Sequence, residues 1–241
     1  MRNLYAKHLG CASIPFHFQI DTMTTSIKTF EIRSLELHAM AILSESKGLN
    51  THYQGVWLDP QTMPGKVVIF ATNGFQLGLL NTAMKSADCP DAPLFIPVSI
   101  IKKLAKNANV SLWSDGDTSF AKAFVSGAET TFSWSNPGIV ISNWRRVVPS
   151  RVSDVPGAFD VNQLHDFAKV NALLSGIKTT SGRLSVRWNS GSEGGDVFVI
   201  RFPGVPDFLG LNSRFTNAAA AATQMPSLLP TWMEELELAT S

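Results

Sequence analysis

Ala71-Thr72-Asn73-Gly74-Phe75-Gln76-Leu77 is the stretch that decides the fold of this chain. It closes the apolar run 67–70 and leads directly into a second apolar run, 75–81. An apolar run, a polar break and another apolar run are typical of a strand, a tight turn and a second strand. Asn73 and Gly74 suit the break because asparagine and glycine tolerate the positive φ angles of sharp turns. The stretch therefore predicts a hairpin within a sheet.

The composition indicates a folded protein of ordinary charge. The chain has 241 residues, 44% hydrophobic and 16% charged, with a net charge of +1. This length fits one large domain or two domains of about 120 residues, and the composition excludes a disordered chain. The near-zero charge argues against a strongly basic DNA-wrapping protein but leaves room for a local basic face. Cys11 and Cys89 lack metal-ligand spacing, and no stretch approaches the ~20 apolar residues of a membrane span, so we expect a soluble cytoplasmic protein.

A helix followed by several strands is predicted three times along the chain. The first unit has a strand at 27–32, a helix at 34–46 and strands at 52–58, 66–72 and 75–81. The second has a strand at 94–96, a helix at 97–107 and strands at 110–113, 119–126 and either 131–134 or 139–141. The third has a short strand at 158–161, a helix that ends at Gly176, and strands at 184–188, 197–202 and 208–215. An edge strand is also expected at 13–20.

These units predict two domains and a tail. The Pro- and Ser-containing linker 150–157 separates a first domain, 1–150, from a second and partial domain, 158–215. Residues 216–241 form the tail, in which 230–238 favour a short acidic amphipathic helix. This segment is either a mobile terminus, a docking peptide or a cover for an exposed sheet.

Four motifs in order resemble the middle domain of the bacterial DNA polymerase sliding clamp, the β-subunit family. They are Tyr53-Gln54-Gly55-Val56, Ala71-Thr72-Asn73-Gly74-Phe75-Gln76-Leu77, Phe95-Ile96-Pro97 and Asn143-Trp144-Arg145-Arg146-Val147-Val148-Pro149. The similarity covers about 50–150, and 158–215 look like one further clamp unit. The resemblance implies an α+β clamp-like fold of repeated units, with helices on one face of antiparallel sheets.

The resemblance also implies a site. In the family, the turn lines a hydrophobic pocket that captures the short clamp-binding peptides of polymerases and clamp loaders. Asn73, Phe75 and Gln76 replace the aspartate, histidine and arginine of the family's turn, so we expect an altered peptide preference. The pocket residues implied are Thr72, Gly74, Phe75, Gln76, Leu77, Pro149 and Val152.

A basic face is predicted on the helix after Pro97. Helical spacing places Ile100, Ile101 and Leu104 on one side and three lysines on the other. The resemblance implies that Lys102, Lys103, Lys106 and Lys169 face double-stranded DNA without reading its sequence. The alternative is an ordinary solvated lysine face.

No pattern of enzymatic residues is present in the sequence. It lacks a G-x-S-x-G elbow, a Walker loop and H-E-x-x-H, and its five histidines have no ligand spacing. We therefore expect no catalytic residues, metal or cofactor. Trp113 and Trp144 are either base-stacking or packing residues.

Two functions remain open. One is a processivity factor that surrounds DNA and tethers a polymerase or other partner through the pocket. The other is a clamp-fold interaction or regulatory protein, of phage or plasmid type, that no longer encircles DNA. Three units are one too few for two complete clamp domains, so an open sheet edge is expected to be paired by homo-oligomerisation or covered by the tail.

Overall fold

The computed structural model describes residues 28–45, 50–61, 65–83, 92–136, 144–148, 161–178, 185–189 and 197–213. The expected strand at 13–20, the linker 150–157 and the tail 216–241 lie outside these ranges. In chain order the elements are β1 (Phe30–Arg33), α1 (Ser34–Ala41), η1 (Thr51–Tyr53), β2 (Gly55–Asp59), β3 (Val68–Thr72), β4 (Gln76–Asn81), β5 (Leu94–Pro97), α2 (Val98–Ile101), β6 (Asn109–Asp115), β7 (Thr118–Val125), β8 (Ala128–Ser135), η3 (Trp144–Val147), α3 (Val161–Ser175), β9 (Ser185–Asn189), β10 (Val197–Phe202) and β11 (Val205–Ser213).

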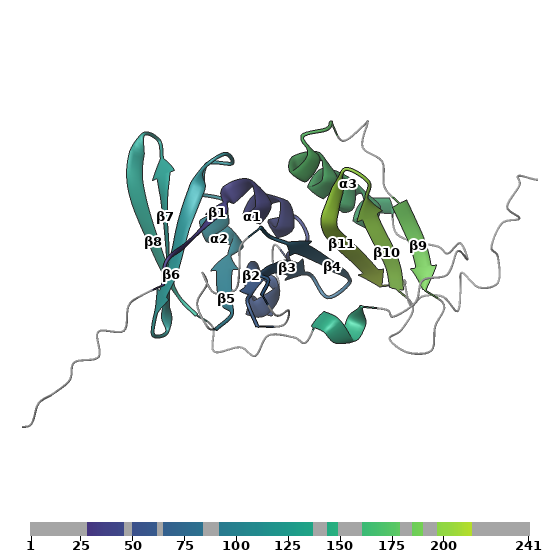
Figure 1. Ribbon diagram of the computed structural model, residues 1–241, viewed down its shortest axis with the longest axis horizontal. Helices are drawn as coiled ribbons and strands as arrows, with labels where there is room; N and C mark the ends of the chain where they lie inside the picture. The colour runs from purple at the N-terminus through teal and green to yellow at the C-terminus, as the bar shows by residue number, and fades with distance from the viewer. Residues whose placement is uncertain are drawn as a thin grey trace, which may run out of the picture.

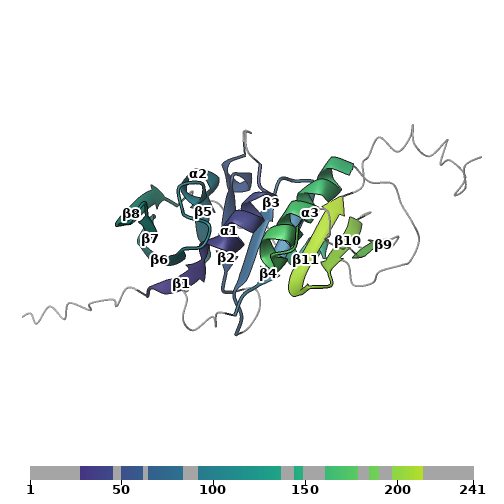
Figure 2. The same cartoon turned by 90° about the horizontal axis from the view of Figure 1, so that it is seen from above.

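The strands form two antiparallel sheets (Figure 1). The larger sheet has seven strands in the order β5-β2-β3-β4-β11-β10-β9, and the smaller has four in the order β1-β6-β7-β8. Helices α2, α1 and α3 lie in a row on one side of the sheets (Figure 2), and α1 contacts both of the others. The predicted α+β clamp-like fold, with helices on one face, is confirmed.

The first two units exchange their first strands. β1 leads directly into α1 but pairs with β6 of the second unit, and β5 leads into α2 but pairs with β2 of the first. Neither sheet is complete without the other unit, so the two units form one intertwined body. The third unit joins this body through the pairing of β4 with β11, which makes one sheet continuous across the units.

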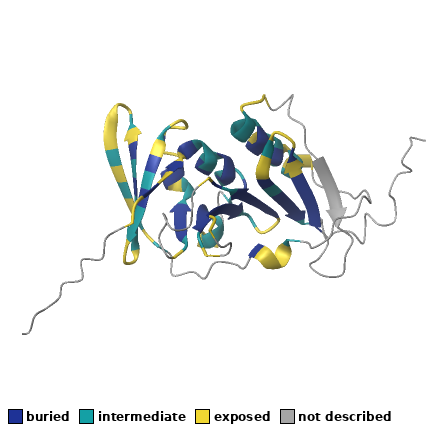
Figure 3. Cartoon of the chain, in the orientation of Figure 1, coloured by how far each residue is buried: buried dark blue, intermediate teal, exposed yellow. Residues whose placement is uncertain are grey.

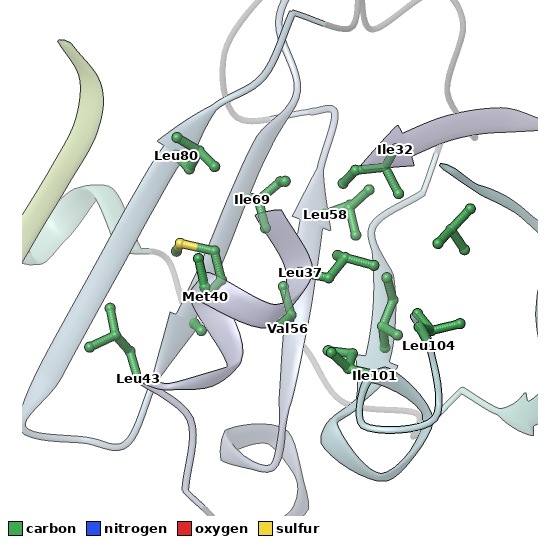
Figure 4. Packing of buried hydrophobic residues seen from close by; sticks show 14 of the residues in the cluster. Ile32, Leu37, Met40, Leu43, Val56, Leu58, Ile69, Leu80, Ile101 and Leu104 are labelled. Carbon is green, nitrogen blue, oxygen red and sulfur yellow. The ribbon is translucent and has the colours of Figure 1, made fainter. Parts of the chain in front are cut away.

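The main core lies between the helices and the sheets. Leu37, Met40 and Leu43 from the first helical segment are fully buried against strands of both sheets (Figure 4). Gly78 on β4 makes room for them, because a Cβ atom there would lie 2.4 Å from Leu43 Cδ1. Figure 3 shows that burial is concentrated in the central strands and on the sheet-facing sides of the helices, whereas β7 and β8 carry exposed positions. The helix side therefore packs too tightly to admit added volume.

The predicted helix at 97–107 is wrong in length. α2 ends at Ile101, after which Lys103 and Leu104 donate to carbonyls three residues back, as in tight turns. The carbonyls of Leu104 and Ala105 instead accept from His38 and from the Ser34 hydroxyl. Tertiary contacts with α1 thus replace the bonds that would have continued the helix.

Two further predicted boundaries differ. The helix predicted at 34–46 begins at Ser34 but ends at Ala41, and the Ser34 hydroxyl donates to the Ala105 carbonyl. Val161 was expected to close a strand, but it opens α3 and is 74% exposed. Gly176 ends α3 as predicted, with a φ of +71° that favours glycine.

Candidate functional site at the junction of the first and third units

The turn between β3 and β4 is held by its own polar side chains. Asn73 Oδ1 accepts from the amides of Phe75 and Gln76 at 3.0 and 2.8 Å. Thr72 Oγ1 accepts from the Gly74 amide at 3.1 Å and donates to the Gln76 carbonyl at 2.6 Å. Gly74 has a φ of +89°, which glycine adopts without strain. The predicted hairpin is confirmed, and its residue types explain its sharpness.

Gln76 faces the helices. Its side chain is 2% exposed, and its Nε2 donates to the Gln163 carbonyl in the first turn of α3 at 2.9 Å. Its Oε1 accepts from Asn73 Nδ2 at 2.8 Å. Gln76 therefore ties the hairpin to the third unit, on the face of the sheet away from Leu77.

Leu77 lies on the opposite face of the sheet, directly across from Leu211 on β11. The Ser213 amide donates to the Phe75 carbonyl at 2.7 Å, which extends the β4–β11 ladder by one residue pair. Strand alternation then places Phe75 on the same face of the sheet as Leu77. Phe75 is 64% exposed, whereas Leu77 is buried. We name the buried apolar residues on this face the outer cluster, which comprises Trp57, Val68, Phe70, Leu77, Leu79, Phe95, Trp144, Val199 and Leu211.

The short helix η3 contributes to the outer cluster. Trp144 packs among its residues and donates from Nε1 to Asp59 Oδ2 at 2.9 Å, with both side chains buried. Arg145 places its guanidinium carbon 5.8 Å from the centre of the Trp144 ring. Trp144 is thus a packing residue, while the half-buried Trp113 stacks on Phe120 at 5.2 Å between ring centres.

The predicted pocket residues divide into three groups. Thr72 and Gly74 shape the turn, Phe75 and Leu77 belong to the outer side, and Gln76 lies on the helix side. Pro149 and Val152 lie outside the described residues. Sequence reasoning missed Leu211 as a neighbour of Leu77. The alternating apolar run that contains Leu211 predicts a strand, but nothing in the run indicates the strand with which it pairs.

The predicted DNA-facing lysines are exposed but not on a common helix. Lys102, Lys103 and Lys106 lie at or after the end of α2, and among the described residues none has a carboxylate within 4.0 Å. Lys103 Nζ sits 5.8 Å from the centre of the Phe132 ring. Lys169 on α3 is paired with Asp166 at 2.8 Å, so its charge is partly balanced. Lys102, Lys103 and Lys106 are therefore exposed, as the sequence predicted, but they lie at and beyond the end of α2 and not along one helical face.

A cavity of about 470 Å³ opens beside Lys102. Its walls combine apolar and polar side chains from η1, β5, α2 and β8, namely Glu45, Thr51, Gln54, Phe95, Pro97, Val98, Ser99, Lys102 and Ser135. The part of the chain that the structure describes contains no cluster of three His, Cys, Asp or Glu residues suited to a metal ion. No helix among the same residues is long and apolar enough to cross a membrane.

Comparison with known proteins gives structural matches only. No family model and no curated protein sequence matches the chain. The fold is similar to a DNA polymerase III β subunit from Borrelia burgdorferi, with a TM-score of 0.52 and 12% identity over 78% of this chain and 64% of that one. A sliding clamp from Pseudomonas aeruginosa gives 0.49 at 11% identity over 78% and 66%, and a β subunit from Thermotoga maritima gives 0.45 at 12% over 83% and 68%.

This chain has a sliding-clamp-like fold. It spans about two thirds of the length of these structures, and slightly less in the Borrelia case. At 12% identity the similarity shows the fold and not the activity.

Proposed function

We propose that this protein is a sliding-clamp-type processivity factor that surrounds DNA as a homo-oligomer and tethers a polymerase or other partner through the outer face beside Phe75 and Leu77. Such a protein carries out no bond chemistry. It needs a closed ring, weak phosphate contacts on the inside, and a docking surface on the outside.

The observation that carries the proposal is the continuity of the larger sheet across units. β4 of the first unit pairs with β11 of the third over five residue pairs, and α1 and α3 pack together on the same side. A sheet that continues from unit to unit with α1, α2 and α3 on one face can be extended by further copies into a layered ring. Its helix side would then face the enclosed DNA.

The charges on the helix side support sliding rather than tight binding. Lys102, Lys103 and Lys106 are exposed and have no carboxylate partner in the described ranges, whereas Lys169 is paired with Asp166. Four lysines on phosphates give a slope of about −3.6 for log K against log salt, and three give about −2.7. Contacts of this number hold the backbone without reading bases.

The outer face supports partner docking. Phe75 presents a largely exposed ring next to the buried Leu77 and Leu211. An exposed aromatic beside a buried apolar cluster is the kind of anchor that apolar peptides recognise. Leu209, partly buried beside the same cluster, extends this apolar surface along β11.

The second candidate function is a clamp-fold interaction or regulatory protein that does not encircle DNA. Gln76 favours it, because the side chain at this position bonds α3 and is withdrawn from the outer face. The balanced charge of Lys169 points the same way.

Topological DNA retention separates the two functions. The protein is threaded onto linear duplex DNA through free ends, the ends are blocked with streptavidin, and the sample is washed at high salt. A ring stays bound until a restriction enzyme cuts the DNA. Loss of the protein during the wash, at a concentration where it is oligomeric, contradicts encirclement and leaves the regulatory role.

Peptide binding tests the docking surface. Fluorescence anisotropy with a labelled apolar clamp-binding peptide is measured for the wild type, Phe75→Ala and Phe124→Ala. Phe124 is 63% exposed on the smaller sheet and serves as the matched control. We expect Phe75→Ala to weaken binding about tenfold or more, since anchor residues cost about 2 kcal/mol, and Phe124→Ala to leave it unchanged. Equal affinities for all three proteins would refute the assignment.

A further inference from the structure

The cavity beside Lys102 lies where the two sheets meet. β5 is an end strand of the larger sheet and β8 an end strand of the smaller one, and both lie beside α2 (Figure 2). Trp134 Nε1 on β8 donates to the Phe95 carbonyl on β5 at 2.6 Å, which joins the two sheets at this point. Ligand cavities commonly lie at interfaces and have volumes of about 300–1,000 Å³, and this one measures about 470 Å³. Its position and size therefore suit a small-molecule site.

The backbone around the cavity is fixed by hydrogen bonds between elements. The Val98 amide at the start of α2 donates to the Gln54 carbonyl at 2.9 Å, and the Lys102 amide donates to the Val98 carbonyl at 2.9 Å. Beside η1, the Glu45 amide donates to the Tyr53 carbonyl at 2.8 Å. The backbone that carries the lining side chains is thus set before a ligand arrives, which lowers the cost of binding.

Two opposite charges line the cavity without pairing. Glu45 is half-buried and Lys102 is exposed, and among the described residues neither has an oppositely charged group within 4.0 Å. The same cavity has apolar surface from Phe95, Pro97 and Val98. It therefore offers one ligand a partner for an anion, a partner for a cation and a wall for an apolar group.

We propose that this cavity binds a small zwitterion, namely an amino acid or short peptide with free ends and an apolar side chain. Lys102 binds the carboxylate of the ligand, Glu45 binds its ammonium group, and the apolar wall holds its side chain. The hydroxyls of Thr51 and Ser99 line the same cavity and can each donate or accept a hydrogen bond. A ligand with a single charge would cover the other charged group of the cavity without pairing it, which costs free energy.

Lys102 links this site to the predicted DNA-facing lysines. A ligand carboxylate on Lys102 competes with a phosphate for the same ammonium group, so ligand and DNA would each weaken the binding of the other. Loss of one phosphate contact changes the slope of log K against log salt by about 0.9. The inference does not rest on the proposed function, because binding of the zwitterion is measured without DNA.

Titration with matched ligands tests the site. Isothermal titration calorimetry on the full chain uses leucine, dileucine and trileucine, in which the two charges lie increasingly far apart, and we expect at least one of them to bind at millimolar concentrations. That ligand is then compared with its N-acetyl form, which lacks the ammonium group, and with its methyl ester, which lacks the carboxylate. We expect each blocked form to bind about three- to tenfold more weakly, as for a partly solvated ion pair.

Two variants show whether the charges act as assigned. Glu45→Gln should weaken binding of the free ligand about three- to tenfold and abolish the effect of N-acetylation, because it removes the partner of the ammonium group. Lys102→Met should do the same for the methyl ester. Glu31→Gln and Lys106→Met are matched controls, since both residues are exposed and neither lines the cavity, and both should bind like the wild type. Circular dichroism checks the fold of each variant.

Three results would each overturn the proposal. The first is that none of the three free ligands binds at millimolar concentrations. The second is that both blocked forms bind the wild type as tightly as the free ligand does, which would show that the two charges are not contacted. The third is that Glu45→Gln and Lys102→Met bind like the wild type, which would place the ligand elsewhere. DNA retention is measured separately, so a protein that binds the zwitterion but does not hold DNA contradicts only the proposed function.

Discussion

Gln76→Leu is the sharpest test of how the hairpin holds the third unit. The substitution keeps the approximate size of a side chain that is 2% exposed, but removes its hydrogen bonds to the Gln163 carbonyl at 2.9 Å and to Asn73 Nδ2 at 2.8 Å. Each neutral hydrogen bond contributes about 0.5–1.5 kcal/mol, so the free energy of unfolding should fall by about 1–3 kcal/mol. For a chain of this length that corresponds to a fall in Tm of about 4–8 °C at the middle of the range.

Gln163→Ala is the matched control in the same contact. It leaves the carbonyl that Gln76 bonds, and it removes a side-chain Oε1 that is buried without a hydrogen-bond partner. Alanine also has the highest helix propensity, so we expect little or no loss of stability. Urea unfolding followed by circular dichroism gives both values, and hydrogen exchange localises the change. If Gln76→Leu unfolds at the wild-type urea concentration, or if α3 amides keep their protection, the hairpin does not anchor the third unit.

Three further outcomes follow from the packing and the charges. Trp144→Phe should lower the free energy of unfolding by about 1–3 kcal/mol in urea titrations, because it removes the buried hydrogen bond that Trp144 Nε1 donates to Asp59 Oδ2 at 2.9 Å. Gly78→Ala should cost about 1–3 kcal/mol in the same assay, because its Cβ would lie 2.4 Å from Leu43 Cδ1, and a wild-type midpoint would refute the packing described. Replacing Lys102, Lys103 and Lys106 together with alanine should make the slope of log K against log salt for duplex binding shallower by about 2.7. An unchanged slope would show that these lysines do not contact DNA.

The sequence predicted individual strands and turns better than it predicted which strands and helices contact one another. β10 spans Val197–Phe202, as its apolar run predicts, and the Thr72–Gln76 turn follows from residue types that bond their own backbone. The helix after Pro97 was predicted too long, because its helix-forming residues are redirected by contacts with Ser34 and His38, which are distant in sequence. Local propensity contains no information about such partners.

At the candidate site, too, the sequence predicts the local structure but not the contacts between units. Strand alternation places Leu77 and Gln76 on opposite faces, but it does not reveal which face is covered by helices and which carries the outer cluster. That assignment depends on β11, which pairs with β4 through Leu211 although the two strands lie in different units. Pattern reasoning therefore selects candidate residues and misses the surface that they form.

The two unusual residues of the turn are best understood together. In the family that the turn resembles, the positions of Asn73 and Gln76 hold an aspartate and an arginine. Here the two side-chain amides are neutral and form a hydrogen bond of 2.8 Å. An arginine at position 76, buried to the same degree and facing the Gln163 carbonyl, would carry a large desolvation cost unless a carboxylate stayed paired with it. The neutral pair avoids that cost and still satisfies a carbonyl of α3. The amide pair therefore meets the Gln163 carbonyl without burying a charge where the third unit packs on the first.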